Sequence, residues 1–265
     1  MFGTMLPLRQ GNEAPALFCV HPVAGMSWGY AGLTRYLAPP QSIYGLQSIG
    51  LVDSMPLSIE AMAIRYLEEI RKVQPRGPYM LVGWSLGGLV AHEIAAQLCR
   101  SGEKVRLLGM LDSYPFRFSE TMAEADVVAA SLGFLGYSPE RLHGANGINA
   151  LADLLTEEYA LNDIPLPPGL SNDELVKKVR RVTEQNLAMA RRFTPGYVPH
   201  DLLFVRAAHR PVGAAGKFLD DRPDVWEDHI GGKVIVHEVA CRHQDMLDPE
   251  PLREISNILA EAMAA

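Results

Sequence analysis

The chain has 265 residues, 48% of them hydrophobic, which is enough for one large α/β domain or two small ones with a sizeable core. Its formal net charge of −7 argues against nucleic acid as the main partner, because binding to a phosphate backbone needs a clustered basic surface. Residues 1–10 lack the apolar run of a signal peptide, and no stretch approaches the roughly 18 apolar residues of a membrane span, so we expect neither secretion nor membrane insertion.

The first half of the chain alternates short apolar runs with amphipathic helices. Strands are predicted over 16–20 and 43–47. Residues 58–74 carry apolar side chains at spacings of three and four, which predicts a helix that Pro75 and Gly77 end. A strand at 79–82, a helix at about 86–101 and a strand at 105–111 follow. Short strands alternating with helices indicate a mostly parallel central sheet flanked by helices.

This alternation stops after Pro115. From 116 to 200 the pattern is mostly helical, and it is clearest at 175–193, where one helix face is apolar and the other basic. Strand-like runs return at 201–207 and 233–239. Asp248 as N-cap with Pro249 at the first helical position predicts a final helix. We therefore expect a single domain over residues 1–265, in which a helical insertion at 116–200 interrupts a parallel-sheet unit.

Residues 83–87 form a G-x-S-x-G sequence, Gly-Trp-Ser-Leu-Gly, between a predicted strand and a predicted helix. A nucleophile elbow needs this setting, because the glycines let the strand and the helix approach a serine held in a strained turn. The pattern predicts an α/β-hydrolase fold with Ser85 as the nucleophile. The alternative is a plain Gly-Ser turn inside a βαβ unit.

A serine nucleophile needs a base, and the base needs a carboxylate that holds its tautomer. Asp112 closes the strand that follows the elbow helix, so the chain returns it to the edge of the sheet where Ser85 lies. We predict that Asp112 is the acid. The alternatives are Asp220, Asp221 and Asp224, which follow the strand at 201–207, because several hydrolases of this fold place the acid there.

The base is predicted from chain order. His243 lies between the last strand and the final helix, where this fold supplies its histidine, and it completes the order Ser, Asp, His. His237 lies within a strand, His229 precedes that strand, and His92 lies inside the elbow helix. We therefore predict that His243 is the base.

The oxyanion of a tetrahedral intermediate needs two backbone N–H donors. Leu86, the residue after the nucleophile, should supply one. The loop at 21–25 should supply the other, and we expect Val23, because Pro22 has no N–H. An ordinary tight turn is the alternative for this loop. We expect His21 to orient the loop rather than to act as a second base, and Trp84 to pack under the elbow.

Together these motifs resemble the thioesterase domain that ends nonribosomal peptide synthetases, and the related domains that end polyketide synthases. The resemblance covers both ends of the chain and is weakest in the insertion. The motifs that carry it are Leu6-Pro7-Leu8-Arg9, His21-Pro22-x-x-Gly25 with Trp28, Gly77-Pro78-Tyr79, the G-x-S-x-G-G run that ends at Gly88, Leu111-Asp112 and His243.

The resemblance implies that Ser85 takes an acyl or peptidyl chain from the phosphopantetheine thioester of a carrier protein. Water, or an amine or hydroxyl of the chain itself, would then release an acid, a lactam or a lactone. The resemblance also implies that the insertion is a lid over the acyl chain. The alternatives are a stand-alone editing thioesterase, a general serine esterase or lipase of the same fold, and a non-catalytic binding module.

The expected partners are a carrier protein and a peptidyl thioester, and the chain is expected to be monomeric. No cofactor or metal is expected, because the sequence has no metal-ligand cluster and no G-x-G-x-x-G loop. Cys19, Cys99 and Cys241 lie apart in apolar surroundings, which favours buried thiols and a cytoplasmic location. One basic helix face either meets an acidic carrier protein or is simply solvated; it comprises Lys177, Lys178, Arg180, Arg181, Arg191 and Arg192.

Overall fold

A computed structural model describes residues 3–115, 172–209 and 222–265 of the chain. Most of the predicted insertion, together with Asp220 and Asp221, lies outside these residues, so the lid stays a prediction. The strands are β1 (Met5–Arg9), β2 (Glu13–Val20), β3 (Gln41–Leu46), β4 (Tyr79–Trp84), β5 (Val105–Leu111), β6 (Leu202–Ala207) and β7 (Val234–Val239). The α-helices are α1 (Ile59–Val73), α2 (Leu86–Arg100), α5 (Asn172–Ala190) and α6 (Pro249–Ala264), and the short 3-10 helices are η1 (Trp28–Arg35), η2 (Ile49–Leu51), η5 (Pro223–His229) and η6 (His243–Asp245).

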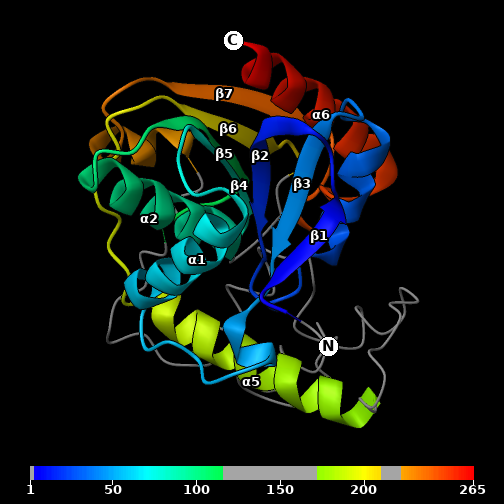
Figure 1. Ribbon diagram of the computed structural model, residues 1–265, viewed down its shortest axis with the longest axis vertical. Helices are drawn as coiled ribbons and strands as arrows, with labels where there is room; N and C mark the ends of the chain where they lie inside the picture. Colours follow the sequence, from blue (N-terminus) through cyan, green and yellow to red (C-terminus); the bar gives the residue numbers. More distant parts are fainter. Residues whose placement is uncertain (1–2, 116–171, 210–221) are drawn as a thin grey trace.

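The strands form one sheet in the order β1-β3-β2-β4-β5-β6-β7, and all pairs except β1 with β3 are parallel. Helices α1 and α2 cover one face, and α6 with η1 covers the other (Figure 1). Each face has its own apolar core, as expected for parallel strands whose two sides are both buried. The predicted α/β architecture is confirmed.

Among the described strands, the antiparallel edge strand β1 was not predicted from the sequence, and neither were the short 3-10 helices. It contains Pro7, which is compatible with an edge strand because an unpaired backbone position there needs no N–H donor. The last residue of the strand, Arg9, donates hydrogen bonds from its guanidinium to the carbonyls of Gln41, Thr34, Leu37 and Ala38. Arg9, the last residue of the motif at 6–9, therefore ties the end of η1 and the start of β3 to the sheet edge.

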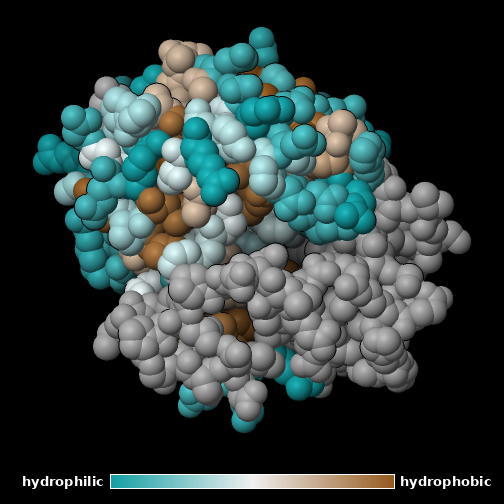
Figure 2. All heavy atoms as spheres, turned by 90° about the vertical axis from the view of Figure 1, so that its right-hand side faces the viewer, coloured by the Kyte–Doolittle hydropathy of each residue, from teal (hydrophilic) through white to brown (hydrophobic). Residues whose placement is uncertain are grey.

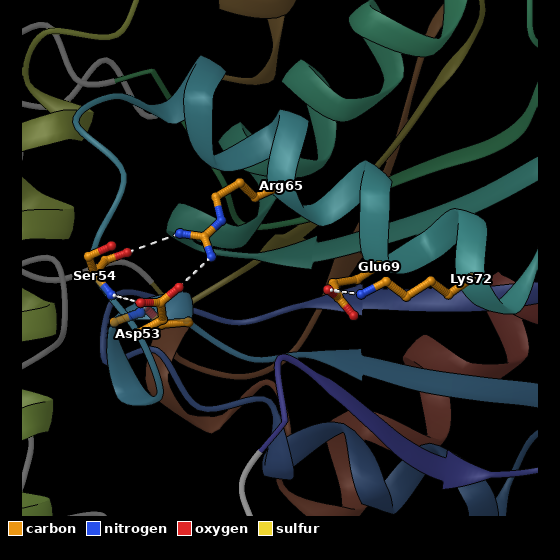
Figure 3. Close-up of polar contacts among 7 residues, drawn as sticks. Asp53, Ser54, Arg65, Glu69 and Lys72 are labelled. Carbon is orange, nitrogen blue, oxygen red and sulfur yellow. Dashed lines mark hydrogen bonds and ion pairs between the residues drawn. The ribbon is translucent and has the colours of Figure 1, made fainter.

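Helix α1 begins at a cap that the hydrophobic pattern alone did not specify. The hydroxyl of Ser58 accepts a hydrogen bond from the N–H of Ala61, which satisfies one of the free donors of the first turn. On the outer side of α1, Arg65 donates to the carboxylate of Asp53 (2.8 Å) and to the carbonyl of Ser54 (3.2 Å), whereas Lys72 pairs with Glu69 of the same helix (Figure 3). Arg65 thus ties the segment after η2 to α1.

The final helix matches its predicted start with one difference. Asp248 is the N-cap residue of α6 and Pro249 occupies the first helical turn, but the Asp248 side chain makes no capping hydrogen bond. The fixed φ of proline and the acidic first turn are therefore the local features that favour this start.

On the face that Figure 2 shows, most described residues are hydrophilic, with apolar residues scattered among them. The large exposed apolar residues of the described part include Leu57, which precedes α1, Ile64 of α1 and Ile235 of β7. Among the helices that the structure describes, none combines the length and the hydrophobicity needed to cross a bilayer.

Candidate active site

Ser85 lies in the turn between β4 and α2, with φ 57° and ψ −126°. A positive φ is unusual for a residue with a side chain and is typical of a strained functional turn. The turn is held on both sides, because the Ser85 N–H donates to the carbonyl of Leu111 (3.0 Å) and the Ser85 carbonyl accepts from Gly88 (3.0 Å). Ser85 is the N-cap residue of α2, yet its hydroxyl makes no capping bond, so the helix does not engage this oxygen.

The glycines of the motif are required by close backbone approaches. A Cβ at Gly83 would lie 2.0 Å from the carbonyl oxygen of Gly87, and a Cβ at Gly87 would lie 2.3 Å from the carbonyl oxygen of Val20. A Cβ at Gly88 would lie 2.3 Å from the hydroxyl of Ser113. Any side chain there would push α2 away from the ends of β2, β4 and β5, so the motif is a close-packed elbow.

Asp112 directly follows β5, the strand that pairs with β4, and is completely buried. Its own backbone has φ 46°, and its N–H donates to the carbonyl of Val205 (2.8 Å) on β6. One carboxylate oxygen, Oδ1, accepts from the hydroxyl of Tyr114 (3.0 Å) and from the N–H of Ala207 (3.3 Å). These contacts hold the carboxylate in one orientation, with Oδ2 turned to a different partner.

That partner is His243, the first residue of η6, which is 2% exposed. Its Nδ1–H donates to Oδ2 of Asp112 at 2.9 Å. Because an ionised carboxylate can only accept, the proton of the neutral imidazole is on Nδ1, and Nε2 is the nitrogen that can take up a proton. The ring also lies 5.4 Å from the indole of Trp84, centroid to centroid, which brings it beside the residue that precedes Ser85.

The structure separates these residues from the alternatives that it describes, whereas Asp220 and Asp221 lie outside the described residues. Asp224 is exposed in η5 and pairs with Arg222 (3.3 Å). His92 is buried in α2 against Trp226, at 4.9 Å between ring centroids, and His229 joins the same cluster. Among the residues that the structure describes, Asp112 is the carboxylate that bonds to His243.

The candidate oxyanion loop follows β2 and lies against the elbow, because Gly87 approaches the carbonyls of Val20 and His21 closely. Within the loop, the carbonyl of Pro22 accepts from Nδ1 of His21 (2.7 Å) and from the N–H of Gly25 (2.9 Å). The N–H of Val23 belongs to the same peptide unit and points opposite to this carbonyl in a trans peptide. His21 therefore orients the peptide whose N–H is the expected donor.

His21 is itself completely buried, and its Nε2 accepts from the hydroxyl of Tyr66 on α1 (2.5 Å). Burial lowers the pKa of His21 to about 4, although its bond to the Pro22 carbonyl opposes this shift. The His21 ring is therefore neutral and makes a hydrogen bond through each of its two nitrogens, which supports its predicted role of orienting the loop. The second expected donor, Leu86, is the first residue of α2, so its N–H has no intrahelical acceptor.

Two tyrosines support the site and were not anticipated. The Tyr30 hydroxyl, which is buried, donates to the carbonyl of Val20 (2.9 Å) and accepts from the N–H of Trp84 (2.7 Å). It thus joins the ends of β2 and β4 where these strands separate. Tyr114 holds Asp112, as described above. The only sequence signal was the position of Tyr30 after the glycine loop and of Tyr114 after Asp112. Trp84, expected under the elbow, packs beside His243.

The described residues contain no group of three or more histidine, cysteine or acidic side chains that is arranged to hold a metal ion. The three cysteines are free thiols, of which Cys19 and Cys241 are buried and Cys99 is partly buried. Burial raises the pKa of the Cys241 thiol to about 12, with the nearby Asp112 carboxylate adding to the shift, so this thiol is no competing nucleophile at neutral pH.

Comparison with known proteins agrees with this geometry. Residues 15–261 match the family model of the thioesterase domain. The chain is 45% identical over 265 residues to enterobactin synthase component F of Escherichia coli, covering 97% of this chain and 18% of that protein. It is 35% identical over 264 residues to a dimodular nonribosomal peptide synthase of Bacillus subtilis, covering 97% of this chain and 11% of that protein.

The chain therefore spans less than a fifth of the length of these two relatives. Among solved structures, the thioesterase domain SrfTE, described as cyclising the lipopeptide antibiotic surfactin, superposes with a TM-score of 0.69 at 20% identity, covering 96% of this chain and 93% of that domain. This likeness confirms the α/β-hydrolase fold. With a family match across nearly its whole length, the chain belongs to the thioesterase domain family, whose members are hydrolases acting on thioesters.

Proposed function

We propose that this domain releases an acyl or peptidyl chain from the phosphopantetheine thioester of a carrier protein in nonribosomal peptide or polyketide biosynthesis. The observation that carries the proposal is the buried hydrogen bond between Asp112 and His243, 2.9 Å long, at the sheet edge where the elbow presents Ser85. The carrier-bound substrate is supported by the relatives, which are multidomain peptide synthases.

In the first half-reaction, Oγ of Ser85 bonds to the thioester carbonyl carbon while Nε2 of His243 takes the hydroxyl proton. The buried carboxylate of Asp112 stabilises the imidazolium that forms. The N–H groups of Val23 and Leu86 donate to the oxyanion of the tetrahedral intermediate. The intermediate then collapses, the carbon–sulfur bond breaks, and His243 returns the proton to the departing pantetheine thiol.

In the second half-reaction, water or an amine or hydroxyl of the bound chain attacks the ester carbon. His243 takes a proton from this nucleophile and gives it to Oγ of Ser85 as the ester bond breaks. The product is an acid in the first case and a lactam or a lactone in the others. Each half-reaction transfers the acyl group and protons without any change of oxidation state, so the proposal includes no cofactor. We further propose that the domain acts in the cytoplasm and does not form homo-oligomers.

The proposal is tested by intact-protein mass spectrometry after mixing the domain with a small peptidyl pantetheine thioester. Wild type should gain the mass of the acyl group and lose it again as an acid or a cyclic product appears. Ser85→Ala should gain nothing, whereas Ser101→Ala, at the far end of α2, should behave as wild type.

A general serine esterase is the second candidate, since the fold alone does not set the substrate. A pantetheine thioester and an oxygen ester of the same acyl group separate the two. Turnover of the oxygen ester alone, with a fluorophosphonate still labelling Ser85, would reject the hypothesis that the substrate is a carrier-protein thioester. Failure of Ser85 to react with either ester or with the fluorophosphonate would reject a catalytic role altogether.

A further inference from the structure

Helix α5 comes from the C-terminal part of the predicted insertion, yet it packs directly on the candidate oxyanion loop. It lies across the end of the sheet toward which the arrow of β3 points (Figure 1). The side-chain amide of Asn186 donates from Nδ2 to the carbonyl of Val23 at 2.7 Å. One turn earlier, Val182 occupies the space that a side chain at Gly25 would need, since a Cβ there would lie 2.6 Å from its Cγ1.

The contact between α5 and this part of the chain is extensive. Lys178 donates to the carbonyl of Leu51 (3.1 Å) in η2, which lies beside the oxyanion loop. An apolar cluster joins α5 to both segments; its buried members are Ala24, Met26, Leu51, Val179 and Val182. The hydrogen bond of Asn186 is therefore part of a packed interface.

Asn186 is completely buried, and the direction of its amide is determined by its partner. A backbone carbonyl can only accept, so the NH₂ group must face Val23. Leaving such a buried carbonyl without a donor is unfavourable, so the loop conformation that keeps the hydrogen bond between Val23 and Asn186 is stabilised.

This bond completes the anchoring of Val23 on both sides. The peptide before Val23 is held through the Pro22 carbonyl by His21 and Gly25, as described above. The peptide after Val23 is held through the Val23 carbonyl by Asn186. With both neighbouring peptide planes oriented, the φ and ψ angles of Val23 have little freedom, and the direction of its N–H is set.

We propose that Asn186 is a positioning residue for the oxyanion hole, through which α5 sets the direction of the Val23 N–H. The inference rests on the proposed function, in which that N–H stabilises the tetrahedral intermediate. Asn186 then acts on the chemical steps rather than on substrate binding. Release of α5 from the loop would lower the rate of both acylation and deacylation.

The test compares Asn186→Ala with Thr183→Val in the full chain. Thr183 lies one turn away on α5 and is equally buried, but its hydroxyl has no hydrogen-bond partner among the described residues, so it is a matched control. The measurements are kcat and KM for the pantetheine thioester, the rate constant for phosphonylation of Ser85 by a fluorophosphonate, and thermal unfolding.

Asn186→Ala should lower kcat and the phosphonylation rate together, by about 10- to 100-fold, since complete loss of an oxyanion donor costs about 100- to 1,000-fold. KM should stay within about twofold, because ground-state binding is unchanged. Thr183→Val should match wild type. Should Asn186→Ala fail to fold, Asn186→Gln keeps a donor and should retain more kcat than Asn186→Ser, whose shorter side chain cannot reach the carbonyl.

Equal kcat values for Asn186→Ala and Thr183→Val, or a loss confined to KM, would overturn the inference while the proposed function stands. A wild-type domain that is inert to both the thioester and the fluorophosphonate would instead remove the proposed function. The two failures are thus distinguishable in one experiment.

Discussion

At the scale of single residues, the site depends on hydrogen bonds whose partners are fully buried. The Asp112 carboxylate accepts from His243, Tyr114 and the Ala207 N–H, and all four residues are buried. In this environment a change of one donor or acceptor has large effects, because the remaining group is left without a partner.

Asp112→Asn tests the assignment of the acid. An amide NH₂ that faces His243 would favour the tautomer with the proton on Nε2, which can no longer accept a proton from Ser85. We expect kcat with the pantetheine thioester to fall about a thousandfold or more. Thermal stability should change little, because the amide oxygen still accepts from Tyr114 and Ala207 and the NH₂ group donates to Nδ1 of His243, so no buried group loses its partner. Asp224→Asn, at the exposed alternative in η5, is the control and should keep wild-type activity. If Asp224→Asn lost activity and Asp112→Asn kept it, the acid would instead be Asp224 of η5.

Tyr30→Phe tests the link between the ends of β2 and β4. It leaves the Val20 carbonyl and the Trp84 N–H without their shared partner, at a cost of about 1–3 kcal/mol for each buried group. We expect a lower free energy of unfolding in urea and a lower kcat. Tyr36→Phe removes an exposed hydroxyl bond to the carbonyl of Pro249 and should change both values little. Equal effects of the two substitutions would contradict the linking role.

At the scale of elements, the spacing between α2 and the strand ends defines the site. The amino end of α2 carries Leu86, and the close approach of Gly87 to β2 sets its distance from the loop that carries Val23. Helix α5 then fixes the loop from the other side. The proposed oxyanion hole is therefore formed where α2, the loop after β2 and α5 meet, rather than by the elbow alone.

Gly87→Ala tests this spacing. The new methyl group would meet two backbone carbonyl oxygens, 2.3 Å and 2.8 Å away, which cannot rotate aside. We expect a loss of about 1–3 kcal/mol in unfolding free energy, the usual cost of overpacking, and a loss of kcat greater than tenfold. For comparison, Gly102→Ala adds a methyl group in open space at φ +77° and should cost about 1–2 kcal/mol of stability with full activity. Full activity of Gly87→Ala would contradict the expected role of this contact.

At the scale of the whole molecule, two histidines are buried on the α1 and α2 side of the sheet. Burial lowers the pKa of His21 and of His92 to about 4, against a value near 6.5 in the unfolded chain. Between pH 6.5 and 4 the unfolded chain therefore binds protons that the folded chain does not, and stability falls as the pH falls through this window. Above it, neither histidine contributes to the pH dependence.

His92→Gln tests this pH dependence without changing a residue of the proposed active site. The wild type should lose a few kcal/mol of unfolding free energy between pH 7.5 and pH 4.5, since each pKa unit corresponds to about 1.4 kcal/mol. The variant should lose less over the same range, as measured by urea unfolding at both pH values. Identical losses would show that His92 does not titrate differently in the two states.

Much of the fold was predictable because its signals are local. Residues 105–111 form β5 as expected, and α1 and α2 match their predicted ranges to within one residue at each end. Apolar runs and helical periodicity depend only on neighbours in the chain. Strand β1 was missed because an edge strand of five residues with a central proline has neither signal, and it is defined by its pairing with β3.

The candidate site was predictable to the extent that it follows from topology. Parallel strands end at one edge of the sheet, so Ser85 after β4, Asp112 after β5 and His243 after β7 were expected to lie near one another. The structure joins Asp112 and His243 directly and sets His243 against Trp84. The residues that orient them were not predictable, since Tyr30 meets Trp84 across 54 positions and Asn186 meets Val23 across 163.

By itself, then, the sequence determined the alternation of strands and helices, the elbow glycines, and the chain order of serine, aspartate and histidine. Only the tertiary structure decided that Asp112 rather than Asp224 bonds to His243, that Tyr30 joins β2 to β4, and that Asn186 of α5 bonds to the loop that carries Val23. The reason is physical: periodicity records which side of an element is buried, whereas a buried hydrogen bond depends on which donor and acceptor packing brings together.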